Sequence, residues 1–248
     1  MQGLLAQHFT LNESGKRCRK KVRRNKVNLT RYADDFVVTA TTPEVAEEVR
    51  ALLTPFLAER GLTLSPEKTL VTHIDQGFDF LGWNFRKHSG KLFVRPSKGA
   101  VRAFLAKTHD VILRDGKAMG PEELIRTLEP KVRGFANHHR HTCCSEAFTY
   151  IAHVMFMQLR RWGIRRHPSK SRGWVRDRYW CVVGGDKYIF GTPDYYLRPM
   201  TWNHVVRHPK LKQDMNPYLN PDYFEKRKRR QKALSSRSLR MPAADVWL

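Results

Sequence analysis

Acidic residues are scarce in this sequence. Its 248 residues contain 23 Asp and Glu against 46 Lys and Arg, so the formal net charge is +23. An excess of positive charge this large attracts polyanions, and nucleic acid is the first candidate among them. The length is sufficient for one large or two modest domains, each with its own hydrophobic core.

Long apolar segments are missing as well. No apolar run approaches the roughly 18 residues that a membrane-spanning helix requires. We also find no long basic helix with a clean apolar face, which would favour a membrane surface as the partner. Residues 1–8 lack the basic start and long apolar stretch of a secretory signal. We therefore expect no membrane partner and no secretion.

Cysteine is rare and irregularly spaced. The four cysteines are Cys18, Cys143, Cys144 and Cys181, and they form no disulfide framework. This pattern is typical of a protein in a reducing compartment, so we expect a cytoplasmic location.

Zinc is one alternative use for these cysteines. On a helix, His139 and Cys143 would share a face at a spacing of four residues, and both are zinc ligands. A structural zinc site needs four ligands, however, and Cys144 would point elsewhere on that helix. No second Cys-x-x-Cys pair exists to complete the set, so we consider zinc unlikely.

The positive charge is concentrated in blocks. Residues 16–31 carry nine Lys or Arg and no acid, residues 158–178 carry eight with Asp177 as the only acid, and residues 226–232 carry six. Short basic runs are usually solvated or disordered, and for residues 226–248 we expect a disordered tail. The middle block differs because aromatic residues are interleaved with its cations, namely Trp162, Trp174, Tyr179 and Trp180. Such a mixture is typical of a nucleic-acid surface, although simple packing of the rings stays open.

The first 95 residues are rich in strand patterns. Residues 27–40 predict a β-hairpin, and residues 78–85 with 91–95 predict a second one. Between them, Thr42 and Pro43 predict the start of a helix, with Thr42 as its cap and Pro43 in its first turn. Pro55 should kink that helix.

After Pro96 the pattern becomes helical. One helix is expected to end near Gly116, a second to begin at Pro121 and a third at Pro130. Ser145 is expected to cap a fourth helix, whose apolar stripe is Phe148, Ile151, Met155, Leu159 and Trp162. After residue 180 the chain is rich in Gly, Pro and aromatic residues, and we predict irregular structure. The fold class is therefore α+β.

Asp34 and Asp35 stand at the expected turn of the first hairpin. Two adjacent carboxylates at such a tip are able to hold divalent cations against the phosphates of a nucleotide, because Mg²⁺ favours oxygen ligands and two-metal phosphoryl transfer needs converging carboxylates. The alternative is a solvated turn, in which Asp is common. The residues alone leave both readings open.

Three segments of this region together resemble a known family. Residues 31–38 (RYADDFVV), 61–69 (GLTLSPEKT) and 77–83 (GFDFLGW) occur in the order and spacing of three successive palm motifs of group II intron reverse transcriptases. The resemblance continues through residues 132–138 (VRGFANH) and 159–170, and it covers about residues 20 to 230.

This resemblance implies a division of the chain into parts. Residues 1–95 would be the C-terminal part of the reverse-transcriptase palm, and residues 96–180 the α-helical thumb, or maturase domain, which grips intron RNA. Residues 181–225, with Asn216, Pro217 and Tyr218, would be the region that binds target DNA. Residues 226–248 would be the basic tail.

The resemblance also implies roles for individual residues. Asp34 would be a metal ligand and Asp35 its neighbour at the catalytic tip, with Tyr32 and Ala33 beneath the primer terminus. Lys68 would lie near the phosphates of the incoming nucleotide. Leu81, Gly82 and Trp83 would help form the hairpin that supports the primer strand. Contacts to the RNA backbone would come from Arg133, Arg160, Arg161, Arg165, Arg166, Lys170 and Arg172.

The chain also departs from the family pattern. Complete members carry fingers and a first palm half with another metal-binding Asp, whereas about thirty residues precede Asp34 here and their only acid is Glu13. Mg²⁺ is therefore expected only if the palm is completed, and we expect no DNA polymerisation by the chain alone. No Cys-rich endonuclease segment is present, so DNA cleavage is not expected.

Three roles stay open at this point. The first is binding of intron RNA and assistance in its splicing. The second is an RNA-directed DNA polymerase completed by a second polypeptide, and the third is an inert remnant.

Overall fold

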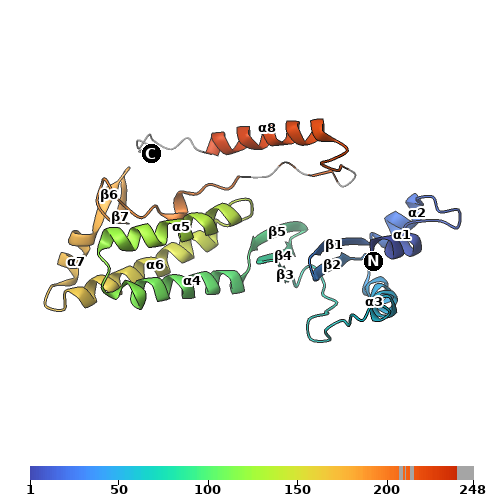
Figure 1. Cartoon of the computed structure of the whole chain (residues 1–248), viewed down its shortest axis with the longest axis horizontal. Helices are drawn as coiled ribbons and strands as arrows, with labels where there is room; N and C mark the ends of the chain where they lie inside the picture. The colour runs from blue at the N-terminus through green and yellow to red at the C-terminus, as the bar shows by residue number, and fades with distance from the viewer. Residues whose placement is uncertain (207–208, 210, 213–214, 239–248) are drawn as a thin grey trace. The chain divides into compact units, whose positions relative to one another are not determined.

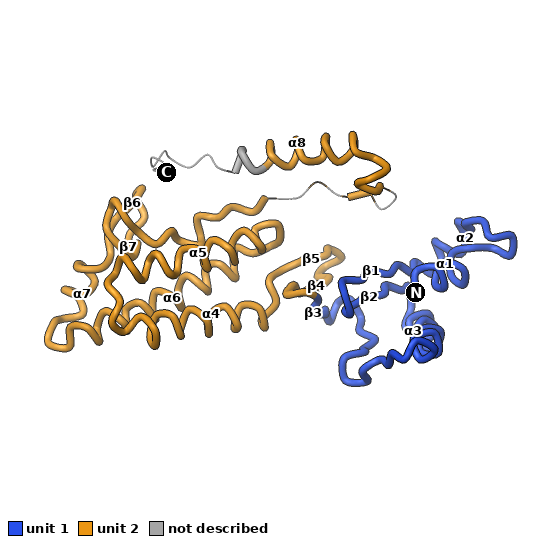
Figure 2. The backbone as a smooth tube through the Cα atoms, in the orientation of Figure 1, with its two compact units in different colours: residues 1–80 blue, residues 81–248 orange. Residues whose placement is uncertain are grey.

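The structure is a computed structural model that describes residues 1–206, 209, 211–212 and 215–238. The chain divides into two compact units, Met1–Phe80 and Leu81–Leu248 (Figure 2). The boundary falls before the second hairpin, whereas the sequence predicted a boundary after residue 95. Both helices and antiparallel strand pairs are present, which confirms the α+β class (Figure 1).

The first unit combines three helices with one hairpin. Its elements are α1 (Gln2–Phe9), α2 (Arg19–Asn25), β1 (Asn28–Tyr32), β2 (Asp35–Thr39), α3 (Pro43–Ala58) and β3 (Phe78–Phe80). A small cluster of buried side chains includes Leu5, Phe9 and Leu53, and Leu29 and Phe36 of the hairpin pack against it. The α3 start agrees with the prediction, because the Thr42 hydroxyl accepts a hydrogen bond from the Val45 N–H at 3.4 Å.

The β1–β2 hairpin is confirmed with a tight turn. Tyr32 pairs with Asp35, which leaves only Ala33 and Asp34 in the loop. Ala33 has φ +50°, in the left-handed region that an alanine side chain disfavours. The positive φ at the first loop residue lets a two-residue turn follow the twist of the strands. The turn therefore contains a strained residue directly beside the candidate metal ligand.

The second unit contains the longer helices. Its elements are β4 (Trp83–His88), β5 (Lys91–Pro96), α4 (Lys98–Leu113), η1 (Asp115–Lys117), α5 (Pro121–His139), α6 (Ser145–Arg166), α7 (Arg172–Tyr179), β6 (Trp180–Val183), β7 (Asp186–Phe190), η2 (Met200–Trp202) and α8 (Pro221–Ser238). Helices α4, α5 and α6 lie side by side and form the body of this unit (Figure 1).

The core of the second unit is centred on α6. Its predicted apolar stripe is buried, and Trp162 is only 1% exposed. The indole N–H of Trp162 donates to the Gly116 carbonyl at 2.7 Å, so the largest core side chain has its polar atom satisfied. A Cβ on Gly116 would come within 2.6 Å of the Val111 carbonyl oxygen, which explains glycine at this contact.

Several boundaries differ from the sequence predictions. The expected strand 78–85 is interrupted because Leu81 and Gly82 both have positive φ and form a turn before β4. Pro130 does not start a new helix but lies inside the continuous helix α5. Ser145 is the first residue of α6, and the N-cap position belongs to Cys144, without a side-chain hydrogen bond.

Residues 226–238 are helical as part of α8, whereas the sequence predicted a disordered tail over residues 226–248. Residues 239–248 of that tail lie outside the described residues. Pro221 begins this helix and Asp222 lies in its first turn, both favourable at a helix N-terminus. The Tyr223 hydroxyl accepts the Lys212 N–H at 3.1 Å, and Arg227 donates to the Pro209 carbonyl at 3.1 Å. Among the described residues, no helix has the length and apolar character needed to cross a membrane.

Candidate nucleic-acid interface and metal-binding turn

The Asp34–Asp35 pair lies at the exposed tip of the β1–β2 hairpin. Tyr32, Ala33 and both carboxylates are exposed, and Tyr32 keeps 66% of its surface accessible. In the part of the chain that the structure describes, neither carboxylate forms a hydrogen bond or an ion pair. Both are therefore available to a cation or to a partner group.

These carboxylates fall short of a complete two-metal site. Among the described residues, there is no group of three or more His, Cys, Asp and Glu side chains that would hold a metal ion. Two-metal phosphoryl transfer needs several converging carboxylates, and two neighbours on one turn do not supply them. The residues present therefore do not fit a working magnesium centre, and no catalytic step follows from them alone.

Lys68 is exposed in a turn within residues 66–68. Its backbone N–H contacts the Ser65 carbonyl at 3.2 Å. Within the described residues, its ammonium group forms no hydrogen bond or ion pair, including with Asp34. The structure thus leaves the nucleotide-binding role of Lys68 a prediction.

Leu81, Gly82 and Trp83 lie at the start of β4 and are partly buried. The Gly82 carbonyl accepts the Ser97 N–H at 2.9 Å, which ties this turn to the start of α4. The Trp83 ring stacks on His138 with centroids 4.5 Å apart and meets the edge of His139 at 5.6 Å. The expected primer-supporting segment is therefore fixed against the C-terminal end of α5.

The predicted His139–Cys143 pair is not on one helix. Helix α5 ends at His139, and the Cys143 N–H donates to the Val94 carbonyl at 2.8 Å. Burial, together with the neighbouring His138, lowers the pKa of His139 to about 4. Burial raises the pKa of the Cys144 thiol to about 11, so this sulfur stays protonated near neutral pH.

The cations of the helical region divide into two groups. Arg133 on α5, Arg161 on α6 and Arg172 on α7 are exposed, and their guanidinium groups form no hydrogen bond or ion pair with the described residues. Arg160 is half-buried and likewise forms none, while the Lys170 ammonium lies 5.5 Å from the centroid of the Trp174 ring. These groups are free to contact phosphates.

Arg165 and Arg166 form the second group. Arg165 donates to the Leu113 carbonyl at 3.0 Å, and Arg166 donates to the carbonyls of Lys117 and Met119 at 3.3 and 2.8 Å. The guanidinium of Arg166 also lies 4.9 Å from the centroid of the Trp162 ring. Both side chains stabilise the connection between α4 and α5, although they remain exposed to solvent on one side.

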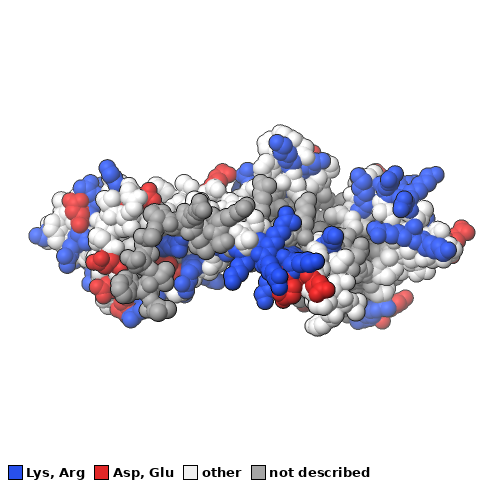
Figure 3. All heavy atoms as spheres, turned by 90° about the horizontal axis from the view of Figure 1, so that it is seen from above, with Lys and Arg blue, Asp and Glu red and all other residues white. Residues whose placement is uncertain are grey.

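The surface charge follows this distribution. Residues 101–180 contain 16 Lys and Arg against 7 Asp and Glu, so this segment alone carries a net charge of +9. Figure 3 draws one view of the whole chain, in which Lys and Arg side chains are more numerous than Asp and Glu side chains. A segment with the net positive charge of residues 101–180 attracts the phosphates of RNA or DNA.

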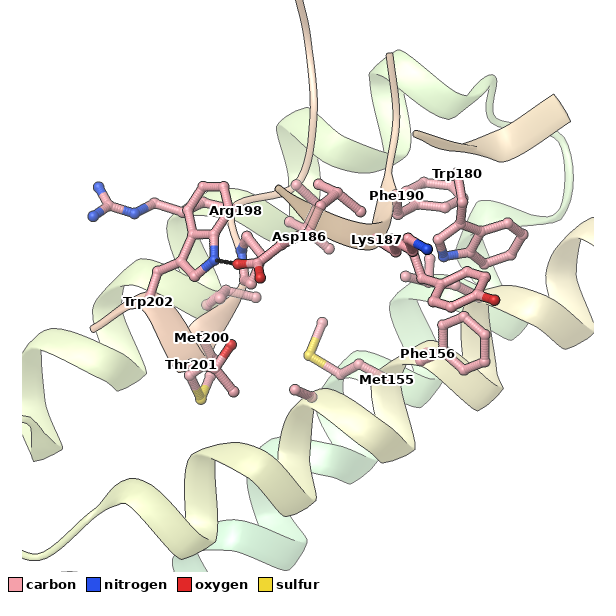
Figure 4. A pocket seen from close by; sticks show the side chains of 17 residues that line it. Met155, Phe156, Trp180, Asp186, Lys187, Phe190, Arg198, Met200, Thr201 and Trp202 are labelled. Atoms are coloured by element: carbon pink, nitrogen blue, oxygen red, sulfur yellow. Dashed lines mark hydrogen bonds between the residues drawn. The ribbon is translucent and has the colours of Figure 1, made fainter. Parts of the chain in front are cut away.

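A cavity of about 300 Å³ lies between residues 180–202 and helices α5 and α6 (Figure 4). From the sequence, Trp180 was predicted to be part of a nucleic-acid surface and residues 181–225 to bind DNA, but no cavity was predicted. Its lining includes Trp180, Asp186, Tyr188 and Trp202. The density of aromatic residues here was visible in the sequence. Their convergence was not, because it depends on how the β6–β7 hairpin folds back over α6.

Comparison with known proteins gives two family matches in order along the chain. Residues 3–85 match the family described as reverse transcriptase (RNA-dependent DNA polymerase), and residues 101–180 match the group II intron maturase-specific domain. These two segments contain the acidic hairpin tip and the cationic helices, respectively.

Curated relatives point the same way. The chain is 27% identical over 162 residues to the group II intron-encoded protein LtrA of Lactococcus lactis subsp. cremoris and to the protein of the same name from strain MG1363. The matched region covers 53% of this chain but only 27% of the length of those relatives. With a reverse-transcriptase segment followed by a maturase-specific domain, this chain belongs to the group II intron-encoded reverse transcriptase/maturase family.

Proposed function

We propose that this chain binds group II intron RNA through the cationic surface of α4–α7 and assists the splicing of that RNA. The observation that carries the proposal is a coincidence of position. The maturase-specific match covers residues 101–180, and the same helices display Arg133, Arg161 and Arg172 without intramolecular partners among the described residues. Free, exposed guanidinium groups are well suited to phosphate oxygens.

The experiment compares two sets of charge-removing substitutions. The first set changes Arg133, Arg161 and Arg172 together to Gln. The second changes Arg19, Lys20 and Arg23, three exposed cations of α2 in the first unit, to Gln. Both sets remove three positive charges, so only the place of the charges differs.

We expect the first set to weaken binding of a group II intron transcript at least tenfold, because several phosphate contacts are lost at once. The second set should reduce the affinity for the transcript clearly less than the first. In a splicing assay at limiting protein, the first set should reduce the rate of intron excision and the second should leave it close to the unsubstituted rate. Equal losses from both sets would reject the proposed surface.

A cytoplasmic location, expected from the cysteine pattern, is part of this proposal. The four cysteines are free thiols in the structure, which a reducing compartment would preserve. Cell fractionation with detection of the full chain checks it.

A second candidate is RNA-directed DNA polymerisation with a polypeptide that supplies further palm carboxylates. The observation that favours it is the exposure of Asp34 and Asp35 within the reverse-transcriptase match. If the site were completed, the two carboxylates would be among the ligands of Mg²⁺, which would supply charge stabilisation for phosphoryl transfer. Tyr32, Ala33 and Lys68 would then border the primer and nucleotide.

Primer extension separates this candidate from RNA binding. Extension that requires both the added polypeptide and Mg²⁺, and that Asp34→Ala abolishes while leaving RNA affinity intact, would support the polymerase. Splicing assistance that is unaffected by Asp34→Ala would support the binding role alone. If the unsubstituted chain shows neither primer extension nor splicing assistance, it is an inert remnant.

Binding of target DNA by residues 181–225 is a further proposal that rests on the family resemblance. A duplex DNA probe, added to the full chain with and without intron transcript, measures it directly. Affinity for duplex DNA below that expected for nonspecific binding by the chain's net positive charge would reject this role.

A further inference from the structure

The cavity near residues 180–202 has aromatic walls on two sides. Trp202 and Arg198 lie on one side of it, and Trp180 and Phe156 lie on the other, with Met155 of α6 beneath the opening (Figure 4). A volume of about 300 Å³ lies at the small end of the range for ligand sites, which suits a single planar ring system. Flat aromatic walls bind such rings by stacking.

Tyr188 on β7 lines the same cavity in a strained conformation. The β6–β7 pairing shifts register between Cys181 and Val183, so two residues of β7 face one residue of β6, as in a β-bulge. Tyr188 has φ +64° at this bulge, a position where glycine is the usual residue. The bulge places the Tyr188 ring in the wall of the cavity. Tyr188 is still 54% exposed, and the centroid of its ring lies 6.2 Å from that of Phe156.

Asp186 provides a polar group at the edge of the cavity. Its Oδ2 atom accepts the indole N–H of Trp202 at 2.5 Å, which fixes the orientation of the Trp202 ring (Figure 4). Within the described residues, its Oδ1 atom forms no hydrogen bond. A carboxylate oxygen at this place is able to accept an imino or amino N–H from the edge of a nucleobase.

Cations at the rim complete the site. Lys187 lines the cavity beside Trp180, while the guanidinium of Arg198 points away from the opening (Figure 4). The Nε atom of Arg198 is buried and has no partner in the described structure, and its backbone N–H donates to Glu129 at 3.1 Å. A base held between the rings would leave its phosphates near the Lys187 ammonium group.

We propose that this cavity binds one unpaired nucleobase of an RNA strand, stacked on the ring of Tyr188 or Trp202 and hydrogen-bonded to Asp186. The inference rests on the proposed function and assigns it a specific contact. Although residues 186–202 of the lining lie in the segment proposed to bind target DNA, RNA is favoured because the floor of the cavity is formed by α6 of the maturase-specific segment. Structured RNA also exposes unpaired bases in loops and bulges, where proteins read them by stacking.

Two hairpin RNAs with the same stem test the proposal. One is fully paired, and the other contains a single bulged 5-iodouridine, whose base offers one imino N–H and crosslinks to aromatic side chains on irradiation. The full chain should bind the bulged hairpin about tenfold or more tightly than the paired one. Crosslinks should map to Tyr188 or Trp202.

Tyr188→Gly is the decisive variant. It removes the ring with its contacts to Phe156 and Arg176 and also relieves the backbone strain at φ +64°, so circular dichroism should show that the fold is retained. We expect it to lose the preference for the bulged hairpin and to keep the affinity for the paired one. Tyr150→Ala is the matched control, because Tyr150 is equally exposed, on α6, and does not line the cavity.

Several outcomes would overturn the inference. These are equal affinity of the unsubstituted chain for both hairpins, an unchanged preference in Tyr188→Gly, or crosslinks confined to other residues. The same preference for a bulged DNA hairpin, or equally tight binding of free uridine monophosphate, would refute RNA as the ligand. Tight binding of both hairpins without preference refutes only the cavity, whereas failure to bind either refutes the proposed function together with it.

Discussion

The two units of this chain differ in charge and in core. Residues 1–80 contain 12 Lys and Arg against 10 Asp and Glu, whereas residues 81–248 contain 34 against 13. The first unit has a small cluster around Leu5, Phe9 and Leu53. The second has a continuous cluster that extends from Val101 on α4 to Met200 on η2.

The difference separates two activities of the family. The candidate catalytic carboxylates belong to the unit with little net charge, and the free arginines belong to the unit with the larger core and most of the excess charge. The RNA binding that we propose for the second unit therefore does not require a complete metal site in the first.

The largest effect is expected at the core of the second unit. Trp162→Ala removes a buried ring and leaves the Gly116 carbonyl without its donor, so the free energy of unfolding of this unit should fall by about 3 to 5 kcal/mol. RNA affinity should fall with it. Trp174→Ala, at a ring that is 39% exposed, should cost less than about 1 kcal/mol. Urea unfolding followed by circular dichroism measures both, and equal costs would contradict the assignment of the core.

The second prediction concerns pH. The folded-state pKa of His139 is lowered to about 4 from its ordinary value of 6.5 because the neutral ring is buried. Protonation therefore favours the unfolded chain. The contribution to stability is complete above pH 6.5 and is lost as the pH falls toward 4, by about 3 kcal/mol in total. His139→Gln should flatten this part of the stability profile, and an unchanged profile in that variant would assign the acid sensitivity to other groups.

The third prediction separates the two groups of arginines. Arg166→Gln removes two hydrogen bonds to backbone carbonyls and the contact with the Trp162 ring, so it should lower the free energy of unfolding by about 1 kcal/mol. Arg161→Gln should change the free energy of unfolding by less than about 0.5 kcal/mol, but it should weaken RNA binding more than Arg166→Gln does. Thermal unfolding and filter binding on the same preparations provide both numbers. Identical behaviour of the two variants would remove the distinction.

The smallest effect is expected at the tip of the first hairpin. Ala33→Gly relieves a left-handed alanine at φ +50° and should stabilise the first unit by at most about 1 kcal/mol, because glycine also adds freedom to the unfolded chain. The same change at Ala46, inside α3, should destabilise it by about 1 kcal/mol. RNA affinity should not change in either variant. Changes of opposite sign in the free energy of unfolding, measured with urea, would confirm the strain at Ala33. Changes of the same sign would contradict it.

Much of the fold was predictable from local pattern. The first hairpin, the cap at Thr42 and the apolar stripe of α6 are all fixed by interactions between residues close in sequence, and the structure confirms them. The turn itself consists of Ala33 and Asp34, one residue earlier than the predicted pair Asp34 and Asp35, because Asp35 already pairs with Tyr32. The continuous helix through Pro130 was not predicted, because the packing of α5 outweighs the lost backbone hydrogen bond.

The candidate sites were less predictable. The sequence predicted RNA contacts for Arg161, Arg165 and Arg166 alike, since nothing local distinguishes the three residues. Their hydrogen bonds to Leu113, Lys117 and Met119 span about fifty residues of sequence and depend on the packing of α4 against α6. The cavity beside Asp186 and Trp202 likewise depends on a register shift that no periodicity reveals.

The most direct test of the central claim is the salt dependence of RNA binding. The affinity of the full chain for a group II intron transcript should be measured between about 50 and 200 mM monovalent salt. If the cationic surface of the second unit engages six to ten phosphates, affinity should fall on the order of a thousandfold or more over this range. The combined Arg133→Gln, Arg161→Gln and Arg172→Gln substitutions should reduce the slope of log affinity against log salt concentration. An affinity that does not change with salt, or a slope that those substitutions leave intact, would contradict the account.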